Sequence, residues 1–453
     1  MALRSFRPLL RLRLALAAAL LAGGGRAQAQ QPAAGAPPVL GQLPAYSSGL
    51  PASPRRLDDF VAVARYNSPL LRDLTNQVSQ IRLDSLRRKA QNGFQVNGTG
   101  AAVYYPSISN RAGEAVVGYD QAVTNGGNYA AVGQVSKPIF NRALLQNDYR
   151  ILGSQGLVLR NSGRLNALDL RRSVTDQFLT AYAAQLQLEF SRGLLTQLRQ
   201  QDKQLRQLVE AGIFKQTQYL SFYLSVRTQE VTVEQNRLAY RRELGTLRAL
   251  AGVGDTALVS IEVPAPPRRR PLAGLLAPAL RQYTLDSLRL QLDRRAVDTY
   301  YRPRVSALAD AGLQSISYMP RALSRSLGVS GGLLLNIPIF DGHQRQLQYQ
   351  RIALSEQSRQ GYRQFLTGQR RQQYEQLENQ IRASDALIVR IRAQLRIADA
   401  LVGATRQQLA TGEVFILDYL NVVTSYRTLQ FNLTQAETDR LRSLYALDYL
   451  GEQ

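Results

Sequence analysis

A duplicated segment constrains this chain more than any other feature of its sequence. The stretch 211–220 returns at 411–420, with Gly, Tyr and Leu in the same places. The tripeptide Pro-Ile-Phe at 138–140 returns at the same spacing, at 338–340. Two separate motifs with one shared spacing indicate two copies of a unit of about 200 residues, and such a repeat fixes the architecture.

Each repeated turn lies between two helical patterns. Upstream of each turn, apolar residues follow alternating steps of three and four, at 181–209 and again at 388–409. This period predicts helices that supercoil around each other with a left hand, and Gly suits the left-handed end of a helix. The sequence therefore predicts two antiparallel hairpins, with long helices at about 143–210 and 343–410 and return helices at about 216–250 and 416–449.

In four other segments the apolar residues alternate with a period of two. Their length and single apolar face are typical of outer-membrane strands, with a soluble β-subdomain beside a coiled coil as the alternative. Four strands cannot close around a lumen, and lipid does not tolerate an open backbone edge, so several chains would have to share one barrel. The predicted strands span about 94–105, 127–138, 304–316 and 325–338, and a loop is predicted at 106–126.

The order of segments along the chain follows from these patterns. A basic start, a short apolar run and the Ala-Gln-Ala of 27–29 predict a secretory signal peptide. Asn67-Ser68-Pro69 predicts a break in the first helix, with Pro69 starting a new one. The predicted parts are a signal peptide (1–29), a Pro/Ala-rich segment (30–56), a first repeat (57–252), a linker (253–272) and a second repeat (273–453).

The composition argues against disulfides, metal sites and enzymatic catalysis. The chain has no Cys, which excludes disulfides, thiolate metal sites and a lipid-modified N-terminal Cys. Its one histidine, His343, excludes a His-based triad within one chain. His343 is interpreted as a lone surface or lumen residue, with a threefold metal-binding ring as the alternative. No acid–base pair, nucleophile motif or phosphate loop stands out, so no catalytic, cofactor or metal site is predicted and an enzyme is disfavoured.

The formal net charge of +23 comes mainly from Arg spread over helical faces. We interpret these arginines as solvated faces, with binding of lipid A phosphates or of anionic cargo as the alternative. No nucleic-acid-binding module is present, so nucleic acid is not an expected partner.

The order of helix, strand pair, long helix, Gly turn and return helix, all repeated, resembles the TolC-like outer-membrane efflux duct family. The residues that carry the resemblance are the junctions Lys-Pro-Ile-Phe-Asn at 137–141 and Ile-Pro-Ile-Phe-Asp-Gly at 337–342, the break at 67–69, and the two Gly turns. The likeness runs from about Leu57 to Leu450.

The resemblance implies a mainly α-helical homotrimer in the outer membrane that extends into the periplasm. Three chains would form a twelve-strand barrel in outer-membrane lipid, continued by a helical coiled-coil duct that docks on a periplasmic adaptor and an inner-membrane pump. Such a duct passively conducts cargo in tripartite efflux or type I secretion. A periplasmic adaptor, or a structural coiled-coil protein of the cell envelope, is the alternative.

The resemblance also assigns residues. Acidic side chains past the second turn ring the closed tip in this family; Asp418 matches the first position, and Asn421 replaces the second. One carboxylate ring is therefore expected instead of two, and the Arg that ties the tip in some relatives is missing near Val414. A helix-start charge is the alternative for Asp418. The first repeat has Gln218 and Ser221 at these positions.

Two further sets of residues complete the expected site. Pro138 and Pro338 are expected to end strands, because proline has no backbone N–H to donate to a neighbouring strand. Phe140 and Phe340 are expected to pack at the junction of barrel and duct. The tip residues expected to contact an adaptor are Gly212, Thr217, Tyr219, Leu220, Gly412, Leu417, Tyr419 and Leu420, and the junction residues are Pro138, Phe140, Pro338 and Phe340.

Overall fold

Two very long helices organise the part of the chain that the structure describes. The computed structural model describes residues 54–103, 108–109, 115–117, 128–139, 141–267, 280–315 and 326–452. The predicted signal peptide and most of the Pro/Ala-rich segment lie outside these ranges. The helices are α2 (Leu57–Asn67), α3 (Pro69–Gln91), α5 (Arg142–Glu210), α6 (Gln216–Ala251), α8 (Arg281–Tyr300), α10 (Gln344–Thr411) and α11 (Ile416–Glu452).

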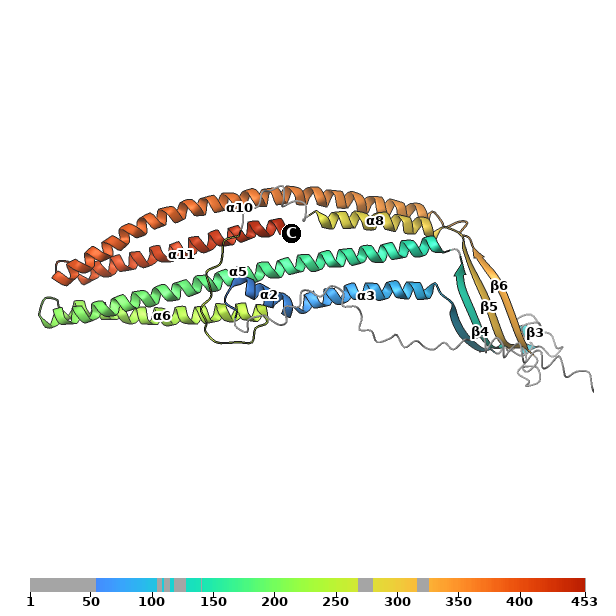
Figure 1. The fold of residues 1–453 in the computed structure, drawn as a ribbon, viewed down its shortest axis with the longest axis horizontal. Helices are drawn as coiled ribbons and strands as arrows, with labels where there is room; N and C mark the ends of the chain where they lie inside the picture. Colours follow the sequence, from blue (N-terminus) through green and yellow to red (C-terminus); the bar gives the residue numbers. More distant parts are fainter. Residues whose placement is uncertain are drawn as a thin grey trace, which may run out of the picture. The chain divides into compact units, whose positions relative to one another are not determined.

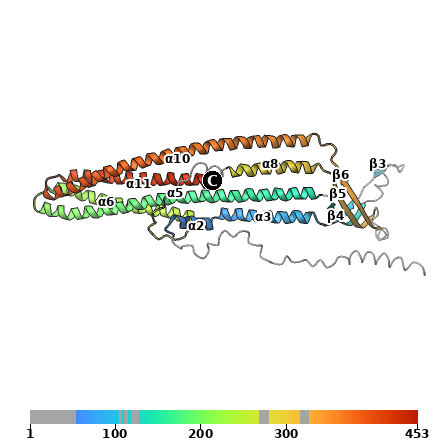
Figure 2. The ribbon, with the colours of Figure 1, turned by 45° about the horizontal axis from the view of Figure 1, so that its top comes forward.

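The hairpins are those that the sequence predicts. Helix α5 has 69 residues and α10 has 68, which is about 100 Å each at 1.5 Å per residue. Helix α6 packs along the half of α5 that lies away from the strands, and α11 packs along the corresponding half of α10 (Figures 1 and 2). The buried seam positions follow the predicted seven-residue period and include Leu188, Leu195, Leu198 and Leu205 in α5 and Ile381, Ile388, Ile391 and Leu409 in α10.

The halves of α5 and α10 that lie next to the strands are covered by the shorter helices that precede the strands. Helix α3 packs on α5, and α8 packs on both α5 and α10. The Asn147 side chain of α5 donates to the carbonyl oxygen of Leu292 in α8 at 3.4 Å, and that of Asn161 donates to Gln282 at 2.9 Å. At the predicted break, Ser68 Oγ accepts a hydrogen bond from the Leu71 backbone at 3.4 Å, and α3 begins at the following proline.

The strands form one four-stranded antiparallel sheet in the order β1-β4-β5-β6. These are β1 (Gln95–Val103), β4 (Asn128–Ile139), β5 (Arg304–Ser315) and β6 (Leu327–Asn336). Because β4 pairs with β5, the sheet joins the two repeats. The predicted loop at 106–126 also contains a short antiparallel pair, β2 (Ile108–Ser109) and β3 (Ala115–Val117), which the sequence analysis missed because such short strands show no alternation.

The segment 253–267, part of the predicted linker, has no regular secondary structure and is held by buried polar groups. The Gln185 Oε1 atom of α5 accepts from the backbone N–H of Ile261 at 2.7 Å and from the Tyr240 hydroxyl of α6 at 2.9 Å. Arg248, only 4% exposed, donates to the backbone carbonyl oxygens of Asp255 and Ala257. The linker therefore packs as part of the helical body rather than as a loose tether. Residues 268–272 of the predicted linker lie outside the described ranges.

The main hydrophobic core runs between the two hairpins and includes α2. Phe60 of α2 meets Phe178 of α5 edge to face, with ring centroids 5.9 Å apart. Helix α11 is bonded to α5 through Thr175 and Tyr449, whose hydroxyls are hydrogen-bonded, and through Arg171 and Asp448 at 3.8 Å. These contacts fix the second hairpin against the first at mid-length.

Candidate functional site

The sheet has one apolar face that no other part of the described chain covers. The pairing register places the odd-numbered residues of β4, β5 and β6 in rows with the even-numbered residues of β1. Val329 and Leu333 on this face are 71% and 73% exposed, although burial of such side chains from water is worth about 1.5–3 kcal/mol each. The apolar face consists of Val96, Gly98, Gly100, Ala102, Tyr129, Ala131, Gly133, Val135, Lys137, Ile139, Val305, Ala307, Ala309, Ala311, Leu313, Ser315, Leu327, Val329, Gly331, Leu333 and Leu335.

The opposite face is mixed and carries the polar groups. Asp310 lies in one row with Gln134 and Ser330, and the Ser330 hydroxyl donates to its carboxylate at 2.6 Å. The sheet therefore has an apolar face and a mixed polar face on opposite sides. The same arrangement is found in barrels whose apolar side faces lipid and whose polar side lines an aqueous channel.

Both edges of the sheet have only one neighbour. Strand β1 pairs only with β4, and β6 pairs only with β5, among the strands that the structure describes. The predicted twelve-strand barrel is thus not formed within one chain.

The junction residues behave differently from one another. Strand β4 continues one residue past Pro138, whereas β6 ends two residues before Pro338. Phe340 is 81% exposed in the single chain, so its expected packing at the junction stays a prediction that needs a neighbouring copy. Its only described aromatic contact is an edge-on one with His343, at 6.1 Å between ring centroids. Phe140 lies outside the described residues.

The two hairpin tips touch each other. Gly212 and Gly412 have φ angles of 77° and 80°, in the left-handed region that favours glycine. A Cβ atom on Gly412 would lie 3.0 Å from Cγ2 of Ile213. Phe222 of the first hairpin stacks on Tyr419 of the second, with centroids 6.4 Å apart. The tips therefore form a single apolar contact between the repeats.

This packing separates the predicted tip residues into two groups. Tyr419 is only 2% exposed, so its expected role as an adaptor contact is wrong, and its ring packs the tip instead. Tyr219 is partly buried. Burial is the larger cause of the raised pKa of its hydroxyl, and the negative charge of the nearby Asp202 is the second. Leu420 is partly buried as well. Thr217, Leu220 and Leu417 are exposed, as are the two glycines of the turns.

Two exposed residues at the tips were not among those expected from the sequence. Ile213 and Phe415 are 54% and 68% exposed, and each lies next to a buried partner, Phe214 and Ile416 respectively. The signal was an apolar pair beside each turn, of which one member must point outward.

The two expected gate positions lie at the start of α11. Asp418 and Asn421 are both exposed, and the Asp418 carboxylate has no hydrogen-bond or ion-pair partner among the described residues. Its counterpart Gln218 instead accepts a hydrogen bond from the backbone N–H of Lys215 at 3.1 Å and caps α6. The two repeats therefore differ at this position in charge and in side-chain partners.

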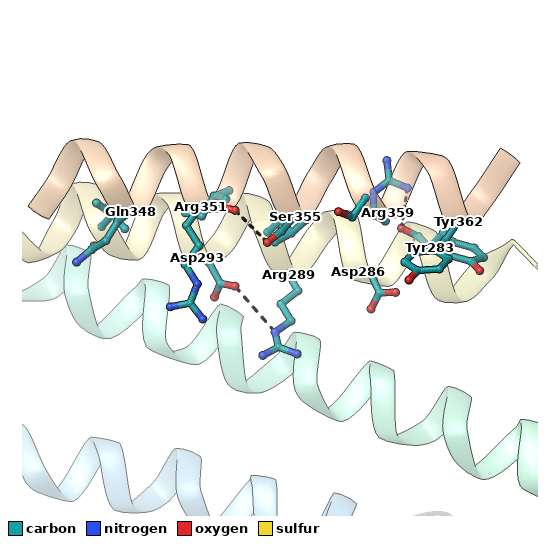
Figure 3. A pocket seen from close by; sticks show the side chains of 13 residues that line it. Tyr283, Asp286, Arg289, Asp293, Gln348, Arg351, Ser355, Arg359 and Tyr362 are labelled. Carbon is teal, nitrogen blue, oxygen red and sulfur yellow. Dashed lines mark hydrogen bonds and ion pairs between the residues drawn. The ribbon is translucent and has the colours of Figure 1, made fainter. Parts of the chain in front are cut away.

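An open groove of about 780 Å³ lies between α8 and α10 (Figure 3). Arg289 and Asp293 form an ion pair along it at 3.9 Å, and Arg359 donates to the carbonyl oxygen of Tyr283 at 3.2 Å. No cluster of potential metal ligands occurs in the described part of the chain.

No helix within the described ranges has the length and apolar content of a bilayer-crossing helix. No family model and no curated protein matches the sequence.

Solved structures, in contrast, match nearly the whole chain. The channel-forming protein CusC superposes with a TM-score of 0.69 at 14% identity, covering 86% of this chain and 91% of CusC. The outer-membrane protein VceC of Vibrio cholerae gives 0.67 at 14% identity, covering 87% and 96%. The outer-membrane channel MtrE of Neisseria gonorrhoeae, in its open state, gives 0.66 at 11% identity, covering 88% and 89%. The chain therefore has the fold of these outer-membrane channels.

Proposed function

We propose that this chain is the subunit of a homotrimeric outer-membrane channel that extends into the periplasm. The channel passively conducts cargo delivered by an inner-membrane pump through a periplasmic adaptor, in tripartite efflux or type I secretion. The pump supplies the energy, and the channel itself makes and breaks no bonds.

The observation that carries this proposal is the sheet with an exposed apolar face and two unpaired edges. Backbone N–H and C=O groups left unpaired in lipid cost several kcal/mol each, so such a sheet must close. Three copies supply twelve strands, and the mixed face of each sheet then lines the lumen. The fold shared with outer-membrane channels supports this reading.

Exposed apolar side chains on the helices support contact between copies. Phe365 of α10 is 70% exposed. A neighbouring copy that offers the outer side of α3 would cover this stripe. The exposed residues are Leu347, Leu354, Tyr362 and Phe365 on α10 and Leu70, Leu83 and Leu86 on α3.

The tips supply the contacts with the adaptor and the gate. Ile213, Leu220, Phe415 and Leu417 form the exposed apolar set that docks on the adaptor. Asp418 provides one carboxylate per chain, and three chains bring these into a single ring at the constriction. An adaptor or an envelope coiled coil is disfavoured as the function, because neither needs an amphipathic sheet built jointly from both repeats.

The first test is the oligomeric state of protein extracted from outer-membrane fractions in mild detergent. We expect a trimer that resists SDS until boiled and that conducts ions in a planar bilayer. A water-soluble monomer in the periplasmic fraction would contradict the proposal.

A cross-linking experiment tests the closure of the sheet directly. The chain has no Cys, so Thr99→Cys on β1 can be combined with single Cys substitutions of Gly328, Ser330 or Gly332 on β6. All four positions lie on the mixed face, and we expect oxidation to link chains into dimers and trimers for at least one pair. Thr99→Cys combined with Arg396→Cys, on an exposed part of α10, is the matched control and should give no cross-link.

A further inference from the structure

We propose that Lys137 and Phe94 form a binding site for the headgroup of an anionic phospholipid at the helical end of the sheet. This inference rests on the proposed function, since it requires the apolar face of the sheet to lie in a bilayer. It adds a defined lipid contact to the general burial of that face.

Lys137 is the one charged residue on the apolar face of the described sheet. It lies in β4, two residues before the strand ends, and its side chain is exposed. A lysine at this level can keep its alkyl chain against apolar surface while its ammonium group reaches the layer of lipid phosphates. Its position at the edge of the face, rather than at its centre, fits this arrangement.

The ammonium group is oriented by an aromatic ring rather than by an acid. Lys137 Nζ lies 4.3 Å from the centroid of the Phe94 ring, and Phe94 is 68% exposed. No carboxylate pairs with Lys137 among the described residues. A cation over a ring keeps its N–H donors free on the side away from the ring, and an anionic phosphate is the group that a bilayer offers there.

The apolar surface continues past the sheet at the same end. Ile337 is 49% exposed and Ile339 is 94% exposed, both in the segment between β6 and α10. Both residues follow the end of β6, so exposed apolar side chains continue past the last strand into the connection to α10. In the proposed bilayer arrangement, Lys137 and Phe94 lie near the strand ends, at the depth where headgroups meet the acyl chains.

The repeat provides an internal control. The residue that corresponds to Lys137 in the second copy is Ile337, at the spacing of 200 that relates the two Pro-Ile-Phe motifs. The proposed site thus occurs once per chain, in the first repeat only. A variant with Ile337→Lys would add a second positive group at the equivalent place.

The test is native mass spectrometry of the detergent-purified trimer with added dioleoyl-phosphatidylglycerol or dioleoyl-phosphatidylcholine. We expect retention of about one phosphatidylglycerol per chain, and binding about fivefold weaker for Lys137→Gln, given about 1 kcal/mol per basic residue at a bilayer surface. Lys137→Arg should retain binding, Phe94→Leu should weaken it, and Ile337→Lys should raise the number bound. Arg396→Gln, on an exposed part of α10, should change nothing.

The outcomes separate this inference from the proposed function. An SDS-resistant trimer that binds both lipids equally, or that binds phosphatidylglycerol as well with Lys137→Gln, overturns the lipid site alone. A water-soluble monomer overturns the channel and the site together. Each variant is scored only as SDS-resistant trimer, so a folding defect is not mistaken for lost binding.

Discussion

The hydroxyl group of Tyr445 in α11 donates a hydrogen bond of 2.7 Å to the backbone carbonyl oxygen of Ala265 in the linker. The same linker is bonded to α5 through Gln185 and to α6 through Tyr240. A segment that connects the repeats in sequence therefore also joins the second hairpin to the first.

These contacts predict a loss of stability at high pH. Burial raises the pKa of Tyr240, Tyr445 and Tyr449 to about 12 each. In the unfolded chain tyrosine loses its proton near pH 10. Ionisation therefore stabilises the unfolded state at a lower pH than the folded state. The free energy of unfolding should be unaffected by these groups below pH 10 and should fall as pH rises from about 10 to about 12.

The measurement is the thermal unfolding midpoint of the purified protein as a function of pH. Tyr445→Phe should lower the free energy of unfolding by about 1 kcal/mol near pH 8, because the hydrogen bond to the carbonyl oxygen of Ala265 is lost, and should flatten the decline above pH 10. Tyr362→Phe is the control, because Tyr362 is exposed on α10. An unchanged slope for Tyr445→Phe would contradict the assignment.

The close approach of β4 and β5 predicts a site that accepts only glycine. A Cβ atom on Gly312 would lie 2.2 Å from the carbonyl oxygen of Ala131 and 2.6 Å from Cα of Val132. Gly312→Val should destabilise the sheet by about 2–3 kcal/mol and reduce the yield of SDS-resistant trimer. Gly328 is its partner across β5 and β6 and has open space at the Cβ position, so Gly328→Val should leave the trimer intact.

The hairpin tips predict a separation between stability and docking. Tyr419→Ala removes a buried ring that stacks on Phe222 and should cost about 3 kcal/mol, seen as a lower unfolding midpoint. Leu417→Ala removes a side chain that is 65% exposed and should leave the midpoint unchanged. In a binding assay with the purified adaptor, Leu417→Ala should weaken binding. Equal effects of the two variants on stability would be evidence against this arrangement.

The unpaired carboxylate at the start of α11 predicts an effect on conductance. Asp418→Ala should weaken block by divalent cations in single-channel recordings, because the ring loses its negative charge. Gln218→Ala, at the matching position of the first repeat, should not. Asn421→Asp should strengthen block by adding a second ring, and identical block in all three variants would refute the gate assignment.

The sequence alone predicted the repeat, both hairpins and the four long strands. The predicted ends of these helices and strands differ from the observed ends by at most a few residues. This was possible because each element carries a periodic signal of its own: a seven-residue seam in α5 and α10, alternation in β5 and β6, and a glycine where φ must be positive. The short strands β2 and β3 carry no such signal, and their pairing was missed. The role of Tyr419 was misjudged because the identity of a residue does not indicate which neighbour covers its side chain.

The sequence by itself thus determined the local structure and the duplicated order of the elements, since both depend on residue spacing along the chain. Only the tertiary structure decided that Tyr419 packs inside the tip, that the linker bonds both hairpins, and that Lys137 stands over Phe94 on an otherwise uncharged face. Each of these joins residues from separate elements, in some cases from different repeats. The physical reason is that burial and hydrogen bonding depend on which surfaces meet, and one chain's periodicity does not encode that.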